Sequence, residues 1–294
     1  MSRLPAGTPK GILLVMTAVV FFSVGDLLAK QLTRDYPIPL IVWARFTFHL
    51  LFVIVALGPR HRLALFRTRF PGIQFLRGLM LLFGSIFFIT ALKYMPLAET
   101  TAIAYLAPIL VTLMSVVFLK EKVDLGRWIA ILCSFVGVLT IIRPGSSVFT
   151  WAVLLPIANA LAFATYQILT RRIAGLESPY TSILYAGLVG SLLSLATLPE
   201  AWTLPKSPVH LLLFLGIGIL GSAGHLILIK AYNHAPLSRL APFSYSQLIW
   251  VAIIGYVVFD DFPDAWSLTG IAILLASGIY IAGRARQGDP VQTS

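Results

Sequence analysis

The sequence predicts an all-α membrane protein in which ten transmembrane helices form two inverted five-helix repeats, with both termini in the cytoplasm. Three observations predict this fold: the composition, a motif that occurs twice, and the uneven distribution of basic residues. Of the 294 residues, 58% are hydrophobic and only 11% are charged, whereas a soluble domain carries about 25% charged residues. The mean hydropathy is +0.90. This composition leaves too little polar surface to cover a globule in water, so the expected solvent is lipid.

The repeated motif divides the chain into two related halves, residues 1–145 and 146–294. The segment Ala91–Ala98 is echoed by Ala231–Ser238, and Pro96 corresponds to Pro236 at an offset of 140 residues. At this or almost the same offset further pairs coincide: Tyr105 with Tyr245, Glu121 with Asp261, and Lys30 with Arg171. Related halves that each contain an odd number of spans must lie upside down relative to each other. That arrangement is typical of secondary transporters.

Ten apolar segments are long enough to be spans, because about 20 apolar residues cross the hydrocarbon core. The first is interpreted as a retained span rather than a signal peptide, since the apolar pattern resumes after Asp26 and a similar segment lies inside the chain. The connections are short and marked by Pro, Gly or charged residues, so any function must lie among the helices. The expected spans are 11–31, 39–58, 72–94, 97–119, 125–142, 151–172, 180–198, 209–233, 238–259 and 266–284.

The orientation follows from the positions of Lys and Arg. With a cytoplasmic amino terminus, fifteen of these residues lie on the cytoplasmic side and five on the other, as the positive-inside rule requires. The net charge of +11 would suggest nucleic acid in a soluble protein, but here the basic residues lie between apolar runs and act as topology signals. No nucleic acid partner is therefore expected. Cys133 is the single cysteine, which excludes a disulfide within the chain and makes a cysteine metal site unexpected.

The fourth and fifth segments resemble those of a known family. Pro96, Leu106-Ala107-Pro108-Ile109, the run from Phe118 to Lys122 and the later Gly126 and Gly137-Val138 are similar to the drug/metabolite transporter superfamily, and more narrowly to its ten-helix bacterial (EamA-type) metabolite exporters. The resemblance covers essentially the whole chain and extends to aromatic amino acid exporters. It implies outward transport across the bacterial inner membrane, through a central cavity lined by the first, third and fourth helices of each half. Leu248 and Asp261 depart from the motif of the first half, so the halves are not expected to be functionally equal.

Asp26 and Lys30 are the one acid–base pair within a single expected span, four residues apart and therefore on one helical face. They could form a proton-linked carboxylate tuned by its lysine. Alternatively they form a neutralised ion pair near the membrane surface, or Lys30 extends outward to the interface. Arg45 and His49 repeat the spacing on the second span, where packing or interfacial anchoring is the preferred interpretation.

The remaining candidates are polar or small residues on spans expected to line the cavity, because polar groups in lipid usually face a bundle interior or water. The ninth span has the densest run of neutral hydrogen-bonding groups and is expected to contribute most. The glycine-rich eighth span predicts a flexible gate, and its histidine is a candidate pH-responsive group; packing between helices is the alternative for most of these positions. The substrate-binding candidates are Ser85, Tyr105, Asn159, Tyr166, His225, Ser244, Tyr245, Gln247 and Trp250, and the gate candidates are Gly221 and Gly224.

This inventory of aromatic and neutral polar groups, with few charges near helix centres, favours a zwitterion or neutral amphiphile, above all an aromatic or apolar amino acid. A cationic drug on an aromatic wall is the alternative, and a channel is the alternative from another class, although no filter segment is visible. No catalytic or phosphate-loop motif occurs, so neither an enzyme nor an ATP-driven pump is expected. The expected partners are a small-molecule substrate and the bilayer. No cofactor or metal is expected. The sequence leaves the oligomeric state open, with a monomer as one of the states considered.

Overall fold

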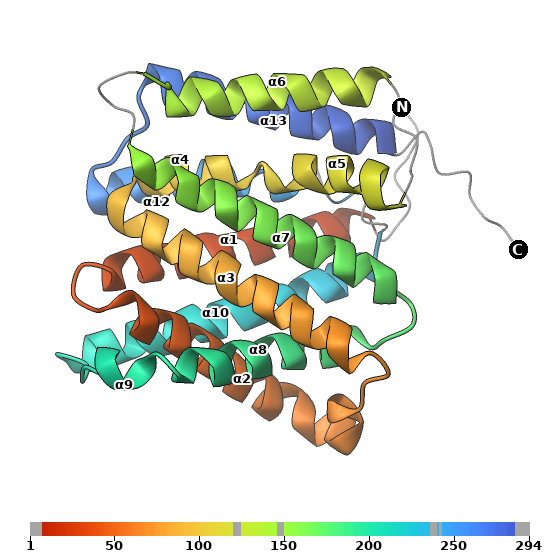
Figure 1. Cartoon of the computed structure of the whole chain (residues 1–294), viewed down its shortest axis with the longest axis vertical. Coiled ribbons are helices and arrows are strands. Elements are labelled where there is room, and N and C mark those ends of the chain that lie inside the picture. Colours follow the sequence, from red (N-terminus) through yellow and green to blue (C-terminus); the bar gives the residue numbers. More distant parts are fainter. Residues whose placement is uncertain (1–7, 120–124, 146–149, 236–239, 241–242, 286–294) are drawn as a thin grey trace, which may run out of the picture.

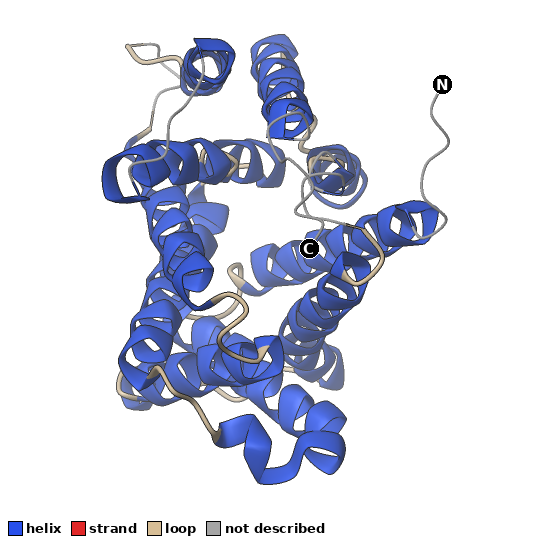
Figure 2. Ribbon diagram, turned by 90° about the vertical axis from the view of Figure 1, so that its right-hand side faces the viewer, coloured by secondary structure: helices blue, strands red, loops and turns tan. Residues whose placement is uncertain are grey.

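The computed structural model describes residues 8–119, 125–145, 150–235, 240 and 243–285, and in these ranges it contains helices and their connections but no strand (Figure 2). Five of the longer α-helices are α1 (Thr8–Leu32), α2 (Ile38–His61), α3 (Pro71–Tyr94), α7 (Leu154–Ile173) and α10 (Pro208–Tyr232). The others are α4 (Leu97–Ala104), α5 (Ala107–Leu119), α6 (Leu125–Ile142), α8 (Pro179–Leu195), α9 (Leu198–Ala201), α12 (Gln247–Phe259) and α13 (Ala265–Ala285), with 3-10 turns at Arg62–Phe66 and Trp151–Val153.

The helices are long and apolar in the way that a bilayer requires. Within the described ranges, six helical stretches have the length and composition to cross a membrane; they begin at Thr8, Ile38, Pro71, Leu97, Trp151 and Pro208. Four further apolar helices are shorter. Large apolar side chains such as Val55, Leu125 and Val257 are exposed on the outside, where lipid would cover them.

The fourth expected span, 97–119, is two helices rather than one. α4 ends at Ala104 and α5 begins at Ala107, because Pro108 has no N–H to donate to the Ala104 carbonyl and its ring would crowd that carbonyl. The chain between them tightens, so that the Leu106 N–H donates to the Ile103 carbonyl three residues back. The expected span is therefore interrupted at this point, although Leu97–Met114 as a whole is long and apolar enough to cross a membrane.

The ninth expected span, 238–259, is interrupted at the equivalent place, although Leu248 stands where the first half has Pro108. Residues 236–239 and 241–242 lie outside the described residues; residues 243–244 are helical, Tyr245 and Ser246 form a turn, and α12 begins at Gln247. The Ser246 hydroxyl donates to the Phe243 carbonyl over 2.7 Å, and the Leu248 N–H donates to the Tyr245 carbonyl. A serine that bonds to a backbone carbonyl in this way distorts a helix.

Helices from the two predicted halves pack against each other throughout (Figure 1). α6 and α13 lie together at one end of the molecule and α2 and α8 at the other. Between them α1 packs on α10, and α3 packs on α7. Further contacts join α2 to α10, α8 to α3, α1 to α12 and α7 to α5. One large apolar cluster lies among α1, α2, α3 and α10, and a second among α4 to α7, α12 and α13.

Glycines allow these helices to approach closely, as is common in membranes. A Cβ on Gly218 of α10 would lie 2.7 Å from the His49 nitrogen and 2.9 Å from the Phe48 carbonyl carbon of α2. These backbone atoms cannot move aside to make room for a Cβ, whereas the end of a flexible side chain could. In contrast, a Cβ on Gly221, one turn later on α10, would meet nothing within 4 Å.

We therefore expect Gly218→Ala to lower the free energy of unfolding by about 1–3 kcal/mol, the usual range for overpacking. Gly221→Ala is the matched control; it should leave that free energy unchanged or raise it by up to about 1 kcal/mol, because alanine favours the helix. Denaturant unfolding of both variants in detergent micelles measures the difference. Equal stability of the two variants would contradict the close α2–α10 contact.

Candidate functional site

The two interrupted helices meet at their interruptions. The hydroxyl of Tyr105, between α4 and α5, donates to the Ser244 carbonyl over 2.8 Å. It also lies 3.1 Å from Oε1 of Gln247, and the rings of Tyr105 and Tyr245 are 5.1 Å apart between centroids. These four residues were candidates from the sequence, and the structure brings them together from opposite halves of the chain.

Asp26 of α1 joins this group. Its carboxylate accepts a hydrogen bond from Nε2 of Gln247 over 3.2 Å, and the residue is only 7% exposed. The opposite charge that acts on Asp26 comes from Arg45 of α2. Tyr105, Gln247 and Asp26 thus form a continuous polar chain, which we call the central polar chain. Arg45, for which packing or anchoring was the preferred interpretation, also acts electrostatically on this chain.

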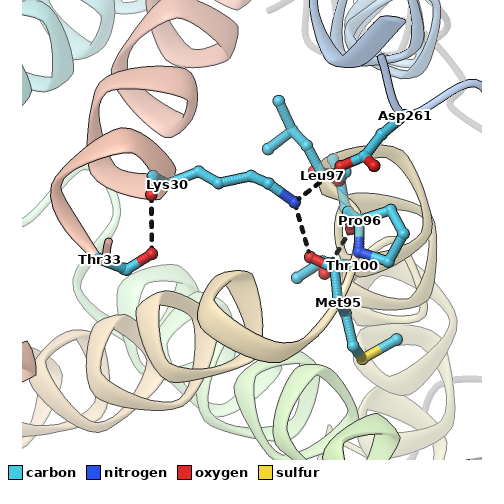
Figure 3. A network of polar contacts seen from close by, with 8 residues as sticks. Lys30, Thr33, Met95, Pro96, Leu97, Thr100 and Asp261 are labelled. Atoms are coloured by element: carbon cyan, nitrogen blue, oxygen red, sulfur yellow. Dashed lines mark hydrogen bonds and ion pairs between the residues drawn. The ribbon is translucent and has the colours of Figure 1, made fainter. Parts of the chain in front are cut away.

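Lys30 is part of a different network, at the end of α1 (Figure 3). Its ammonium donates to the Met95 carbonyl at the α3–α4 corner over 2.9 Å. It also forms an ion pair with Asp261, in the connection between α12 and α13, at 3.2 Å. The ring of Phe259 lies 5.1 Å from the ammonium. The Lys30 side chain is buried and ties three segments together, so the expectation that it pairs with Asp26 or extends outward was wrong.

Lys30 does not pair with Asp26, because two residues on one helical face can direct their side chains toward different neighbours. The Lys30 side chain leaves α1 toward the α3–α4 corner, and the dashed contacts of its ammonium group in Figure 3 lie at that end. Glu99 of α4 also acts electrostatically on Lys30, and one of its carboxylate oxygens is buried without a hydrogen-bond partner. We call Lys30, Asp261 and the Met95 carbonyl the α1-end latch.

The glycine-rich helix α10 runs unbroken from Pro208 to Tyr232. A Cβ on Gly224 would lie 2.6 Å from the Phe22 ring of α1, so this glycine serves a close helix contact. His225 lies beside Phe22, with ring centroids 5.0 Å apart, and 6.4 Å from the ring of His49. Gate flexibility at Gly221 and Gly224, and a pH response of His225, stay predictions.

The other candidates lie in contacts between helices, outside the hydrogen bonds of the central polar chain. Asn159 of α7 donates to the Gly84 carbonyl of α3 over 2.9 Å. Ser85 is buried, and its hydroxyl has no hydrogen-bond partner. Trp250 packs on the apolar cluster between the start of α1 and the end of α10. Tyr166 accepts a hydrogen bond from Arg77 over 3.1 Å.

Arg77 is the residue whose importance the sequence analysis missed. It lies in the second turn of α3, is 2% exposed, and also donates to Thr170 of α7 over 2.9 Å and to Gln74 over 2.5 Å. Gln74 is fully buried and donates to Ser182 of α8. A basic residue within a membrane span is rare and usually functional, so Arg77, close to the start of the third expected span, was a signal that could have identified this position.

Several known proteins are similar to this chain in sequence. The model of the EamA-like transporter family matches the chain twice, over residues 9–143 and 150–283. Similar proteins include an S-adenosylmethionine uptake transporter of Rickettsia felis, 28% identical over 92% of each chain, and a riboflavin transporter of Vibrio cholerae, 27% identical over 92% of each. A pseudopaline exporter of Pseudomonas aeruginosa is 25% identical over 95% of this chain and 97% of its own.

A solved crystal structure has the same fold. It superposes with a TM-score of 0.65, covering 96% of this chain and 99% of the other at 21% sequence identity.

The α1-end latch makes a measurable prediction. Lys30→Met removes both the ion pair and the Met95 contact, so it should destabilise the protein more than Asp261→Asn, which removes the ion pair alone. A double-mutant cycle on unfolding in detergent should give a coupling free energy of about 1 kcal/mol, since Asp261 is partly exposed. The control cycle pairs Asp261→Asn with Arg34→Met, the neighbouring cation on the Phe259 ring, and should give a coupling near zero. Equal coupling in the two cycles would contradict the pairing.

Proposed function

Because the chain belongs to the EamA-like transporter family of multi-pass membrane proteins, within the drug/metabolite transporter superfamily, we propose that it is a secondary transporter that exports a small amphipathic metabolite by alternating access. The observation that carries the proposal is the central polar chain: Tyr105, Gln247 and Asp26 are joined in the interior, at the two points where helices are interrupted. In lipid, irregular backbone is tolerated where it is buried in protein or lines a cavity. Discontinuous helices near the middle of the membrane are a common way to build a substrate site.

We infer ten membrane passes in two inverted repeats, residues 1–145 and 146–294. Supporting this, the family model matches once in each half. The helix contacts are also conserved when the halves are exchanged: α1–α10 becomes α7–α3, and α2–α10 becomes α8–α3. α1 begins and α13 ends on the same side of the molecule (Figure 1), as an even number of passes requires. The excess of Lys and Arg makes that side cytoplasmic, in the bacterial inner membrane.

With this orientation the α1-end latch lies at the external end of the bundle. We infer that it holds the external side closed, because it joins α1 to the α3–α4 corner and to the α12–α13 connection. Opening toward the outside then requires Lys30 to leave Asp261 and the Met95 carbonyl. A single chain contains every group in this scheme, so a monomer would suffice.

The groups of the central polar chain suit an amino acid with an apolar or aromatic side chain. The Asp26 carboxylate can receive an ammonium group, Tyr105 and Gln247 offer neutral hydrogen bonds, and the rings of Tyr105, Tyr245 and Phe22 offer apolar surface. Similar proteins are named for S-adenosylmethionine, riboflavin and pseudopaline, which supports a small metabolite as substrate. Both uptake and export occur among those names, so the outward direction rests on the resemblance to exporters.

A cationic aromatic compound is the second candidate, because a buried carboxylate beside aromatic rings also suits a cation. Both candidates can be tested in proteoliposomes loaded with a radiolabelled amino acid or a cationic dye. A carrier should release its labelled substrate faster when unlabelled substrate is added on the other side. Release that no added solute accelerates would indicate a channel and would contradict the proposal. Repeating the exchange with and without a pH gradient distinguishes proton coupling from facilitated diffusion.

Variants of the central polar chain should slow this exchange. Tyr105→Phe removes the hydroxyl that bonds to Ser244 and Gln247, and Gln247→Ala removes the link to Asp26. The loss of one hydrogen bond is worth about 1 kcal/mol, so we expect the exchange rate to fall about five- to tenfold in each variant. Tyr256→Phe, an exposed tyrosine on α12, is the matched control and should exchange like the wild type. Wild-type rates in Tyr105→Phe, Gln247→Ala and Tyr245→Ala would exclude these residues from the binding site.

A further inference from the structure

We propose that Arg77 forms a second binding site, in which a carboxylate of the transported compound pairs with the guanidinium between α3 and α7 at the cytoplasmic end of the bundle. This inference rests on the proposed function, because it assumes that a small solute enters from the cytoplasm. It adds a residue and a substrate group that the central polar chain does not include.

Arg77 is held in place by neutral groups alone. Its Nε donates to the Thr170 hydroxyl, Nη1 to Oε1 of Gln74 and Nη2 to the Tyr166 hydroxyl. The guanidinium carbon also lies over the Tyr166 ring, 4.8 Å from the ring centroid. The three partners fix the plane of the guanidinium without neutralising its charge.

No carboxylate in the described part of the chain lies within ion-pair distance of Arg77, although other basic residues there have such partners: Lys30, Arg143 and Lys206. Glu177, just beyond α7 on the same side, instead accepts hydrogen bonds from the Thr68 hydroxyl and the Arg69 N–H. A buried charge without a counter-ion destabilises a protein by several kcal/mol. Because the chain keeps the buried charge of Arg77 in spite of this energetic cost, we expect that charge to pair with a ligand from outside the chain.

The geometry favours a carboxylate as that partner. A guanidinium has five N–H groups, and the three hydrogen bonds above leave two of them for a ligand. A carboxylate matches this planar donor arrangement. A phosphate would call for several converging cations, whereas Gln74, Thr170 and Tyr166 are neutral. The Tyr166 ring stacks on Phe163 at 5.7 Å and 20°, which provides apolar surface next to the charge.

The site is separate from the central polar chain along the membrane normal. Lys30 of α1 contacts Met95 at the end of α3. Asp26 lies four residues before Lys30, about 6 Å of helix, whereas Arg77 lies eighteen residues before Met95, about 27 Å. Arg77 is therefore toward the end that the basic residues place in the cytoplasm. Arg77 is almost fully buried while α3 and α7 are in contact, so a solute reaches it when these helices separate. It would therefore act as the first site for a solute leaving the cytoplasm.

The test compares Arg77→Gln, Arg77→Lys and the control Arg172→Gln, an exposed arginine of the last turn of α7. Transport is measured in everted and in right-side-out membrane vesicles, so that each face of the protein is presented separately. The probes are phenylalanine, tyrosine, tryptophan, leucine and methionine, each paired with its carboxamide, which keeps the side chain and ammonium group but has no carboxylate.

We expect Arg77→Gln to raise the half-saturating concentration of the amino acid at the cytoplasmic face at least about tenfold, the effect of losing one charge-assisted hydrogen bond. The values for the carboxamide and for the external face should not change. Arg77→Lys, which keeps the charge, should lie between wild type and Arg77→Gln, and Arg172→Gln should match the wild type.

Two results would overturn the inference while leaving the transporter intact: equal losses for acid and carboxamide, or equal losses at both faces. Either would make Arg77 a contact between α3 and α7 only. If no amino acid is exchanged by the wild type, the proposed substrate fails, and the carboxylate site fails with it. Unfolding of each variant in detergent distinguishes a loss of fold from a loss of recognition.

Discussion

The structure depends on one constraint, that every backbone polar group in lipid needs a partner inside the protein. Regular helices satisfy it alone, but the interruptions near Tyr105 and Tyr245 do not. In a regular helix the Ser244 carbonyl would accept from Leu248; here Leu248 donates to Tyr245, and the Tyr105 hydroxyl bonds to the Ser244 carbonyl instead. The second interrupted helix is thus completed by a residue of the first, so the two must stay side by side. That contact brings Gln247 to Asp26 and creates the polar interior.

Much of this arrangement could be predicted from the sequence, because the sequence signals were local or repeated. Apolar runs of about 20 residues coincide with helices, since length and hydropathy alone determine what a bilayer accepts. Tyr105 and Tyr245 occupy equivalent positions in the repeat and were both candidates for the binding site, and their rings are in contact. Sequence reasoning failed where the outcome depended on three-dimensional partners. The four-residue spacing of Asp26 and Lys30 suggested a pair, yet each side chain found a better partner more than 200 residues away in the chain. The buried setting of Arg77 likewise depends on residues of α7.

Small residues and polar residues have separate tasks in this bundle. Gly218 and Gly224 bring α10 against α2 and α1, and such close contacts contribute van der Waals energy that the hydrophobic effect cannot supply in lipid. Polar contacts then determine which ends of the helices stay together: Lys30 at the end of α1, and Arg77 near the start of α3. The first set holds neighbouring helices close together, and the second joins their ends by hydrogen bonds and an ion pair.

The two interruptions also differ in whether they can be undone. Pro108 has no hydrogen to return to the Ala104 carbonyl, so the gap between α4 and α5 is permanent. In the other half Leu248 keeps its N–H, and the gap rests on the hydrogen bonds of the Ser246 hydroxyl and the Leu248 N–H. The two interruptions lie at equivalent places in the sequence but are therefore held by different means, one by a proline and the other by hydrogen bonds that can be exchanged.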